Sequence, residues 1–340
     1  MCIYNAYFTL AKIFYSMEIL SKYNTLLNQN LEKAVSQNEP AQLYDPIKYI
    51  LSLGGKRIRP ALTLMVCDFF GKDYKEALSA AMAVELFHNF SLIHDDIMDN
   101  APLRRGKATV HEKWDVNTGI LSGDAMLILA YRFFENYNPN TFQDLAKLFS
   151  ETALQVCEGQ QHDMDFETRD DVSLEEYINM IDHKTAVLVG AAMKMGAIVA
   201  DASESDKDKI YQFGRNLGIA FQLQDDYLDV FGNPETFGKQ VGGDIIANKK
   251  TFLYLIAIEH SSKVQAEELE HLYSINPKDP ADKISTVKDI FVNSGAAKAT
   301  QVEIEKYSNL AYSVLNEINI TDEKREMLRQ FGNSLMERNV

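Results

Sequence analysis

The chain has 340 residues, of which 46% are hydrophobic, and its formal net charge is -15. This apolar content is sufficient for a large core, and the acidic balance argues against a nucleic-acid-binding protein, which is usually basic. An anionic substrate is still compatible with the charge, because local basic clusters or a metal can override the overall field. No long stretch is rich in proline, glycine or serine, so we predict a single domain over 1–340.

The three cysteines, Cys2, Cys67 and Cys157, are far apart and form neither a disulfide framework nor a metal-ligand spacing. This usage is typical of a reducing compartment, and we predict a cytoplasmic protein. The apolar N-terminal segment is too short for a membrane span and lacks the features of a signal peptide. Met17 is a candidate natural start, which would make 1–16 an upstream extension, and an ordinary first helix is the alternative.

Apolar residues recur at helical spacing along almost the whole chain, and short alternating β-branched runs are nearly absent. The sequence therefore predicts an all-α fold. In chain order, the expected elements are a short stripe at Leu26, Leu27, Leu31 and Ala34, a long buried helix over 77–98, a helix that opens with a capping box at Ser173-Leu174-Glu175-Glu176 and continues toward Ala200, a long helix over 206–230, and shorter amphipathic helices over 250–338.

One motif occurs twice: Asp95-Asp96-Ile97-Met98-Asp99 and Asp225-Asp226-Tyr227-Leu228-Asp229 both read D-D-x-x-D. On a helix, the first and last Asp of each motif lie one turn apart on the same face, and the middle Asp leans off that stripe. Crowded carboxylates repel one another, so two such motifs in one chain indicate a bound cation. Oxygen ligands at this density suit Mg²⁺, which uses one or two carboxylates together with water and substrate phosphate.

Two basic segments accompany these motifs. Gly54-Gly55-Lys56-Arg57-Ile58-Arg59-Pro60 places three cations behind a glycine pair that permits a turn, and Leu103-Arg104-Arg105-Gly106 follows the first Asp motif. Arginine forks bind phosphate oxygens bidentately, so both segments are candidate phosphate clamps. The alternatives are a solvated basic loop for the first segment and a surface turn for the second.

The spacing of His88, Ser91, Asp95 and Asp99 places them on one helical face, which favours a ligand-facing role for His88 over a purely structural one. His94 and Asp95 form the H-D dyad of some metal phosphohydrolases, but the other histidines show no supporting pattern. Further polar residues would surround the Asp motifs with donors for a diphosphate. They are Gln222, one turn before Asp226, Lys184-Thr185, and Lys239 and Lys249 on either side of Asp244.

The ordered set GGKRIRP, HNFSLIHDDIMD, LRRGKATVH, HKT, FQLQDDYLD and GKQVGGDIIANKKT resembles the trans-isoprenyl diphosphate synthases, or polyprenyl synthetases, over 51–251. The resemblance implies an isoprenoid-synthase helical bundle around a central cavity with two facing D-D-x-x-D helices. It also implies Mg²⁺-dependent condensation of isopentenyl diphosphate with dimethylallyl, geranyl or farnesyl diphosphate. A homodimer is expected on the same ground.

The resemblance assigns roles residue by residue. Several Mg²⁺ ions would bind together with the allylic diphosphate. Their protein ligands would be Asp95, Asp96, Asp99, Asp225, Asp226 and Asp229. The allylic-diphosphate donors would be Arg104, Lys184, Lys239 and Lys249, and the isopentenyl-diphosphate clamp would be Lys56, Arg59, His88 and Arg105. Thr185 and Gln222 match positions near the reacting carbons.

Product length is expected to be set before the first Asp motif, where Phe90 and Ser91 lie roughly 6 to 8 Å down the helix from Asp95. Phe87 lies about one turn further. Within the family, an aromatic residue followed by a small one resembles a geranylgeranyl (C20) synthase, and a farnesyl (C15) product is the next expectation. The alternative is that Phe90 is only part of the core.

Two other functions are compatible with parts of the pattern. A class I terpene cyclase shares the first Asp motif, but it usually carries a different second metal motif and needs no isopentenyl-diphosphate clamp. A non-catalytic subunit of a heteromeric prenyl synthase typically lacks the Asp motifs, and both are intact here. The sequence therefore favours a prenyltransferase.

Overall fold

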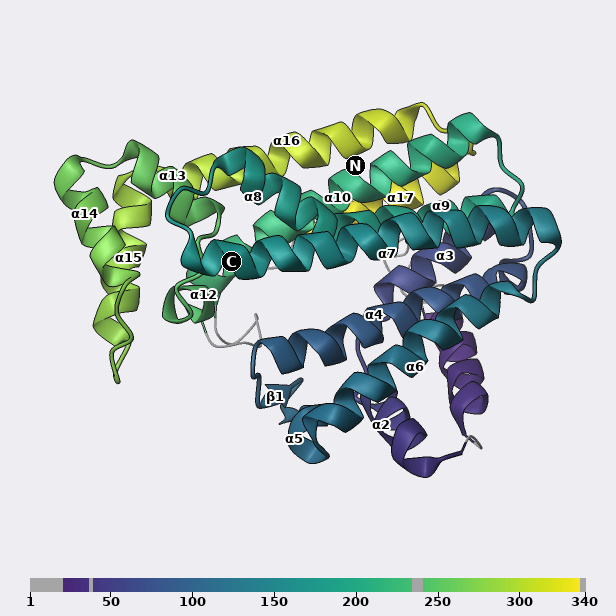
Figure 1. Ribbon diagram of the computed structural model, residues 1–340. Helices are drawn as coiled ribbons and strands as arrows, with labels where there is room; N and C mark the ends of the chain where they lie inside the picture. The colour runs from purple at the N-terminus through teal and green to yellow at the C-terminus, as the bar shows by residue number, and fades with distance from the viewer. Residues whose placement is uncertain (1–20, 37–38, 234–240, 337–340) are drawn as a thin grey trace, which may run out of the picture. The chain divides into compact units, whose positions relative to one another are not determined.

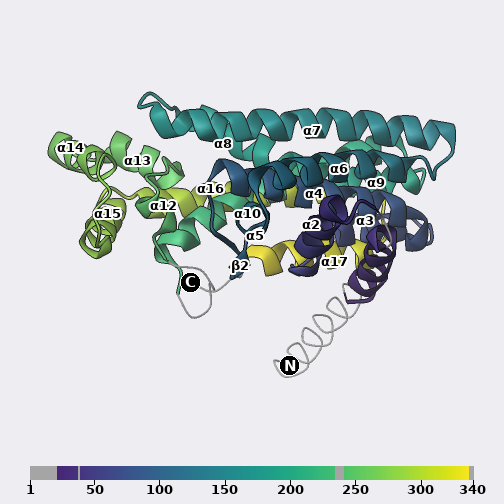
Figure 2. The same ribbon diagram turned by 60° about the horizontal axis from the view of Figure 1, so that its bottom comes forward.

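The computed structural model describes residues 21–36, 39–233 and 241–336 (Figures 1 and 2). Within these ranges nearly all regular structure is helical, so the all-α prediction is confirmed. Three predictions fall outside the described residues: the extension over 1–16, the start at Met17, and the site residue Lys239.

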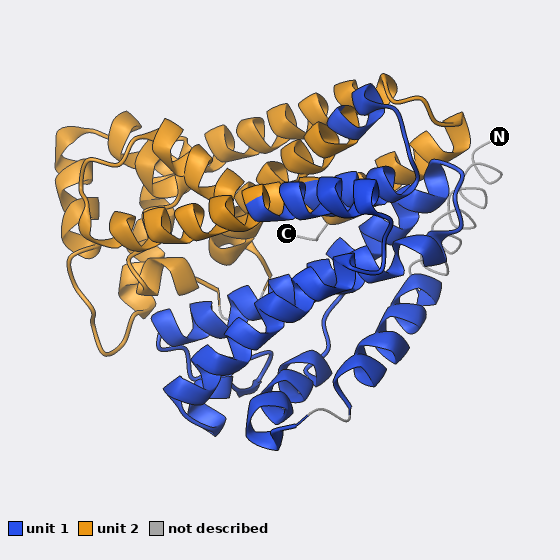
Figure 3. Cartoon of the chain, turned by 45° about the vertical axis from the view of Figure 1, so that its right-hand side comes forward, with its two compact units in different colours: residues 1–150, 191–208 blue, residues 151–190, 209–340 orange. Residues whose placement is uncertain are grey.

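Contacts divide the chain into two compact units, which Figure 3 shows in different colours. Unit 1 comprises 1–150 and 191–208, and unit 2 comprises 151–190 and 209–340. The single domain over 1–340 stays a prediction. Three helices contribute residues to both units, namely α7 (Pro139–Thr168), α9 (Val187–Val199) and α10 (Glu204–Phe231).

The long helix α4 is the centre of unit 1, and its observed bounds, Leu78–Met98, agree with the predicted 77–98. An aromatic cluster packs on it: the ring of Phe149 on α7 lies 5.2 Å from the rings of both Phe87 on α4 and Phe134 on α6. Edge contacts of this kind add to the stabilisation from burial.

The other elements of unit 1 are a helix over 21–35, α2 (Ala41–Ser52), α3 (Ile58–Phe69), η1 (Tyr74–Ala77), α5 (Val110–Lys113) and α6 (Val116–Phe134).

A two-stranded hairpin, β1 (Leu103–Arg104) with β2 (Lys107–Ala108), follows α4 in unit 1 and was not predicted from the sequence. Its two turn residues, Arg105 and Gly106, have φ values of 53° and 72°. Positive φ at both central positions defines the tight turn that suits the twist of a hairpin. Two-residue strands carry too little alternation for a sequence pattern to reveal them.

Unit 2 is built on the C-terminal helices, which pack around a continuous apolar core that includes Tyr177, Leu223, Phe252 and Phe291. α13, α14 and α15 lie together in Figures 1 and 2 and contact one another. The remaining elements of unit 2 are α8 (Leu174–Ile181), η2 (Asp182–Ala186), α12 (Gly243–Ile246), α13 (Phe252–His260), α14 (Lys263–Leu272), α15 (Ala281–Asn293), α16 (Ala296–Asn316) and α17 (Asp322–Met336).

The predicted capping box at Ser173 is present, but the helix that it opens does not continue unbroken toward Ala200. Ser173 Oγ accepts the Glu176 N–H at 3.2 Å, and the Glu176 carboxylate accepts the Ser173 N–H at 2.9 Å. After α8, the π-helical turn η2 inserts before α9. Such turns occur often at functional sites, and η2 carries Lys184 and Thr185.

No helix in the described part of the chain combines the length and the apolar character that crossing a membrane would require.

Candidate active site

The first Asp motif occupies the C-terminal turn of α4, and its middle carboxylate is bound by the protein itself. Asp96 is buried, and Arg104 holds it with Nε 2.9 Å from both oxygens and Nη2 2.7 Å from Oδ1. Asp95 is half-buried and Asp99 is exposed. The motif therefore turns Asp95 and Asp99 toward the more accessible side of the helix, while Asp96 fixes the hairpin to α4.

The two neighbouring arginines of the hairpin have different partners. Arg104 turns to Asp96, whereas Arg105 donates to the carbonyl oxygen of Gly54 in the glycine pair. The backbone of this segment is a turn, and both arginine side chains bind other parts of unit 1. Gly55 lies so close to Arg105 that a Cβ there would stand within 2.9 Å of its Cζ atom.

A cluster of cations surrounds His88 in unit 1. Arg59 Nη1 lies 3.4 Å from His88 Nε2, and Arg59 Nε has no hydrogen-bond partner among the described residues. Burial lowers the pKa of His88 well below its usual value, and the charges of Arg59, Arg105, Arg104 and Arg57 lower it further. The imidazole is therefore neutral at pH 7. A cluster with this excess of positive charge suits an anion such as a diphosphate.

Arg57 does not join this cluster but connects it to α4. Its backbone is left-handed, with φ of 50°, and its guanidinium donates to the Leu51 carbonyl and to the buried Glu85 carboxylate. Asn89 donates to the same Glu85 oxygen at 2.6 Å. Glu85 lies one turn before His88, so this buried contact holds the glycine-pair loop against the helix that carries both His88 and the first Asp motif.

The second Asp motif lies on α10 in unit 2, and again the protein binds the middle carboxylate. The Tyr177 hydroxyl and the Gln222 amide donate to Asp226, the latter at 3.0 Å, and Thr185 Oγ1 lies 3.1 Å from Gln222 Oε1. Burial raises the pKa of Asp226 well above its usual value, and nearby Asp244 adds to the shift. These side chains line a cavity of about 100 Å³, which has room for only part of a diphosphate substrate.

Asp163 on α7 is a site residue that the sequence did not reveal. Its carboxylate lies 2.5 Å from Lys184 Nζ and 3.9 Å from Lys249 Nζ, and all three residues line the cavity. Gln160, one turn earlier, is buried, and neither of its side-chain polar atoms has a partner among the described residues. A single aspartate in an acidic helix carries no signal of its own, and only the fold brings it to the two lysines.

Gly159 explains how α7 approaches η2. A Cβ at this position would stand within 2.8 Å of the His183 carbonyl carbon and the Lys184 Cα atom. The two backbones therefore touch where Lys184 and Thr185 enter the cavity, and only glycine permits this approach.

Asp229 joins the second motif to the short helix α12. Its carboxylate accepts the Asp244 N–H at 2.9 Å, and its carbonyl accepts the Gly242 N–H at 2.6 Å. Asp225 is half-buried on the preceding turn. The structure thus places Asp244 beside the second motif.

The donor chemistry of the motifs fits a divalent cation. Among the described residues, no group of three or more carboxylate, histidine or cysteine side chains is gathered as a complete metal site. Mg²⁺ does not require one, because it takes one or two carboxylates and fills its shell with water and phosphate oxygens. Asp95 and Asp99, one turn apart on α4, are such a pair.

The residues predicted to set chain length, Phe87, Phe90 and Ser91, all lie on α4. The ring of Phe90 is 5.6 Å from that of Phe87 and 4.7 Å from the His94 imidazole, so it belongs to an aromatic stripe along the helix. Ser91 Oγ donates to the His88 carbonyl at 2.9 Å. Phe87 is buried core, whereas Phe90 is partly exposed.

The His94 side chain packs against α6 and not against the carboxylates of the first Asp motif. Its Nε2 atom lies 3.2 Å from the Ile120 carbonyl on α6, and a Cβ on Gly123 of the same helix would meet the ring. The H-D dyad is therefore a feature of the packing between α4 and α6, and not a pair of metal ligands.

An all-helical fold with two aspartate motifs and two sets of cationic side chains is the architecture of a diphosphate-binding enzyme. Residues 40–290 match the family model described as polyprenyl synthetase, and the chain belongs to this family.

Known proteins resemble the chain over nearly its full length. A short chain isoprenyl diphosphate synthase of Methanothermobacter thermautotrophicus is 35% identical, over 95% of this chain and 98% of its own. A crystal structure of a geranylgeranyl pyrophosphate synthase is 56% identical with a TM-score of 0.91, over 94% of this chain and 99% of its own. The polyprenyl synthase of Caulobacter crescentus, solved with calcium and isoprenyl diphosphate, is 27% identical with a TM-score of 0.84, over 97% of both chains.

The backbone approach at Gly159 generates a prediction. Gly159→Ala is expected to force α7 and η2 apart, to destabilise the protein by about 1–3 kcal/mol, and to reduce turnover by displacing Lys184 and Thr185. Urea unfolding and steady-state kinetics measure the two effects. Gln155→Ala, one turn earlier on α7, is the matched control and should change neither. Wild-type stability and turnover in Gly159→Ala would contradict the close approach.

Proposed function

We propose that the protein is a geranylgeranyl diphosphate synthase, which condenses isopentenyl diphosphate with allylic diphosphates to a C20 product. It is a short-chain prenyltransferase of the polyprenyl synthetase family. The observation that carries the proposal is that unit 1 holds both a metal-type Asp motif and a separate cationic cluster. His88 precedes Asp95 by seven residues, which is about 10 Å along α4. Two anion sites at this spacing suit two diphosphate substrates.

The cationic cluster is the proposed site for isopentenyl diphosphate. Arg59 and Arg105, with Lys56 on the adjoining loop, would bind its phosphate oxygens, and the neutral His88 would donate a hydrogen bond without adding a further charge. The buried Arg57–Glu85 contact keeps this loop in place against α4.

Lys184 and Lys249 are the proposed donors to the allylic diphosphate, together with Arg104 and Lys239. Asp163 holds the two described lysines near one point, with Lys184 Nζ 2.5 Å and Lys249 Nζ 3.9 Å from the same oxygen. Their charges stabilise the diphosphate as it leaves. Thr185 and Gln222 lie at the cavity wall, where an oxygen-rich surface suits the developing allylic cation.

Mg²⁺ is the proposed cofactor, and when bound it would neutralise the diphosphate and assist its departure. The proposed ligands are Asp95, Asp96 and Asp99 in unit 1 and Asp225, Asp226 and Asp229 in unit 2. The calcium and isoprenyl diphosphate in the Caulobacter crescentus relative support a divalent cation in this role. Within each motif the two outer carboxylates carry the proposal best, because they are more exposed than the buried Asp96 and Asp226.

The chemistry couples ionisation to carbon–carbon bond formation. Loss of diphosphate from the allylic substrate leaves a carbocation, and the isopentenyl alkene attacks its C1. A proton then leaves the condensed product, and the released diphosphate is the proposed base. Water must be kept from the cation, because it would convert the intermediate to an alcohol.

A second copy of the chain is the proposed partner. The exposed side of α6 carries four large apolar residues, and the side chains of Leu121 and Ile128 are each 60% exposed. Val116 and Ile120 are the other two, at 47% and 41%. An apolar surface of this kind is typical of a protein–protein interface, and it supports a homodimer.

A cytoplasmic location stays a prediction from the cysteine usage.

Product analysis tests the proposed function. Purified protein with Mg²⁺ and isopentenyl diphosphate should extend C5, C10 and C15 allylic diphosphates to a linear C20 product, identified by mass. A C15 product alone would retain the enzyme class and reject the C20 assignment. Cyclised hydrocarbon formed without isopentenyl diphosphate would identify a terpene cyclase. Absence of turnover from folded protein would reject the proposal in favour of a non-catalytic subunit of a heteromeric synthase.

Phe90→Ala is expected to lengthen the product beyond C20, because it removes a partly exposed ring roughly 7 Å along α4 from Asp95. Product mass spectra after full conversion provide the measurement. Phe142→Ala, an exposed aromatic position on α7 in the same unit, should retain the wild-type product. An unchanged product from folded, active Phe90→Ala protein would show that the ring is only part of the core.

Mg²⁺ with inorganic diphosphate is expected to raise the melting temperature, because the bound ligands relieve carboxylate repulsion and bind only the folded state. At a ligand concentration 100 times Kd, the linkage stabilises the fold by about 2.7 kcal/mol. Differential scanning calorimetry with and without EDTA measures the shift. An unchanged melting temperature at saturating concentrations of both ligands would count against the site.

A further inference from the structure

The turn between α12 and α13 carries three consecutive polar residues, Asn248, Lys249 and Lys250, whose side chains have different partners in unit 2. α12 ends in a defined backbone motif: the Asn248 N–H bonds to the Ile245 carbonyl at 3.3 Å, and the Lys249 N–H bonds to the Asp244 carbonyl at 2.9 Å. Asn248 takes the left-handed conformation that this motif requires, with φ of 58°. The backbone path through the turn is therefore fixed.

Asn248 is held from the side of α14 and α15. Its Oδ1 atom lies 2.5 Å from Lys283 Nζ, and its Nδ2 atom donates to Asn276 Oδ1 at 3.0 Å. Lys283 also donates to the Ile275 carbonyl at 3.1 Å, and its amine lies 5.7 Å from the centre of the Tyr273 ring. The amine thus connects α15 to the turn.

Lys283 is an unusual residue for this position. Its side chain is only 3% exposed, and no carboxylate pairs with it among the described residues. Burial lowers its pKa, because the charged amine has lost most of its water. A buried lysine without a counter-ion contributes little to stability, and an apolar side chain of similar size often serves the fold as well. Its hydrogen bonds to Asn248 and to the Ile275 carbonyl are what this residue adds to the structure.

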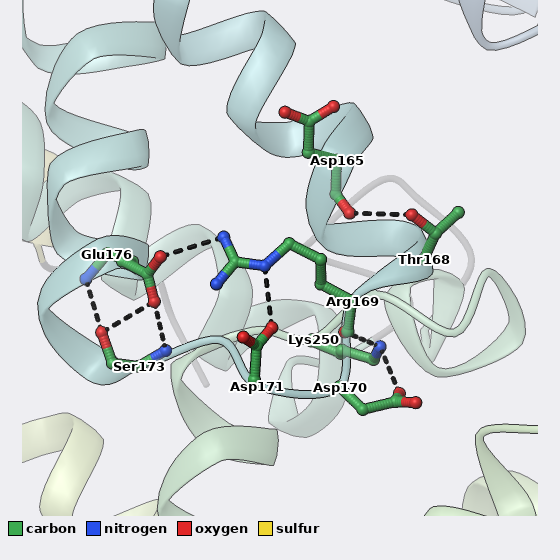
Figure 4. A network of polar contacts seen from close by, with 8 residues as sticks. All are labelled: Asp165, Thr168, Arg169, Asp170, Asp171, Ser173, Glu176 and Lys250. Carbon is green, nitrogen blue, oxygen red and sulfur yellow. Dashed lines mark hydrogen bonds and ion pairs between the residues drawn. The ribbon is translucent and has the colours of Figure 1, made fainter.

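Lys250 is held from the opposite direction, by the connection between α7 and α8 (Figure 4). Its Nζ atom donates to the Arg169 carbonyl and lies 2.9 Å from Asp170 Oδ1. Arg169 itself binds Asp171 at 2.8 Å and Glu176 at 2.9 Å, and Glu176 belongs to the capping box of α8. Lys250 is therefore anchored on a connection that is cross-linked by several polar contacts.

Between these two anchors, Lys249 extends to the cavity of the second Asp motif, where its amine lies 3.9 Å from Asp163. Its position depends on the turn, since neighbouring side chains on such a tight backbone move together. Lys283 and Lys250 thus fix the backbone from opposite sides, and Lys249 lies between them at the cavity, which the Lys250 side chain also lines.

We propose that Lys283, through Asn248, and Lys250 are positioning residues that aim Lys249 at the allylic diphosphate. The inference rests on the proposed function, because it takes Lys249 as a donor to that substrate. Through Lys283, α15 would thus affect the affinity of the active site for one of its two substrates, although it carries none of the predicted site residues.

The test measures KM for farnesyl diphosphate and for isopentenyl diphosphate separately. Lys283→Met and Lys250→Met should each raise the farnesyl diphosphate KM by about tenfold, because a small misplacement of a charged donor is costly. The isopentenyl diphosphate KM should stay at the wild-type value. Lys250→Arg keeps a donor and should restore most of the affinity. Lys278→Met, an exposed lysine before α15, is the matched control and should change neither constant.

A double-mutant cycle separates positioning from a general structural effect. In a Lys249→Met background, Lys283→Met should cause no further rise in the farnesyl diphosphate KM, because the donor that it positions is absent. Asn248→Gly is a second route if Lys283→Met folds poorly, since glycine retains the left-handed turn and removes only the amide. It should reproduce the selective loss of affinity.

Each contrary result has a distinct meaning. Absence of prenyl transfer by the wild-type enzyme would reject the proposed function itself. Normal wild-type turnover, with an unchanged farnesyl diphosphate KM in folded Lys283→Met and Asn248→Gly, would overturn the positioning role. Equal losses for both substrates, or additive losses in the Lys249→Met background, would overturn it as well.

Discussion

Repulsion between neighbouring carboxylates is the constraint on which both Asp motifs depend. Three acids within five residues cannot all remain close and charged without partners, and the protein meets this by binding the middle one. Arg104 does so for Asp96 with a bidentate ion pair, and Tyr177 and Gln222 do so for Asp226 by hydrogen bonds. The two solutions differ in charge. The first pairs the carboxylate with a positive charge, whereas the second surrounds it with uncharged donors, and burial and the nearby Asp244 raise the pKa of Asp226 despite the two hydrogen bonds.

This arrangement also places the surrounding elements. Because Arg104 is committed to Asp96, the hairpin is fixed to α4, and the next residue, Arg105, reaches the glycine-pair loop. In unit 2, Gln222 links Asp226 to Thr185, so the second motif determines how the π-helical turn faces the cavity. The local contacts of the middle aspartates thus organise the donors that the proposed substrates would meet.

The sequence predicted the helices and the polar residues well, since long amphipathic periodicity and a doubled motif are strong local signals. The 77–98 helix was correct to within one residue, and the capping box at Ser173 is present. The hairpin was missed because its two-residue strands carry too little alternation. Asp163 and the packing of the π-helical turn against α7 were missed because they depend on contacts between residues far apart in the chain. Lys184 and Asp163 are 21 positions apart. The need for glycine at position 159 likewise comes from the backbone of His183 and Lys184, which follows later in the chain. The same limit explains why Lys283 had no visible role.

The short helix α12 is bonded at both ends to parts of the candidate site. At its start the Asp244 N–H bonds to the Asp229 carboxylate, and at its end the Asp244 carbonyl accepts the Lys249 N–H. One peptide residue therefore joins a proposed metal ligand to a proposed phosphate donor. A ligand that shifts Asp229 would therefore also shift Lys249, because α12 is bonded to both. The affinities for metal and for diphosphate should then be thermodynamically linked.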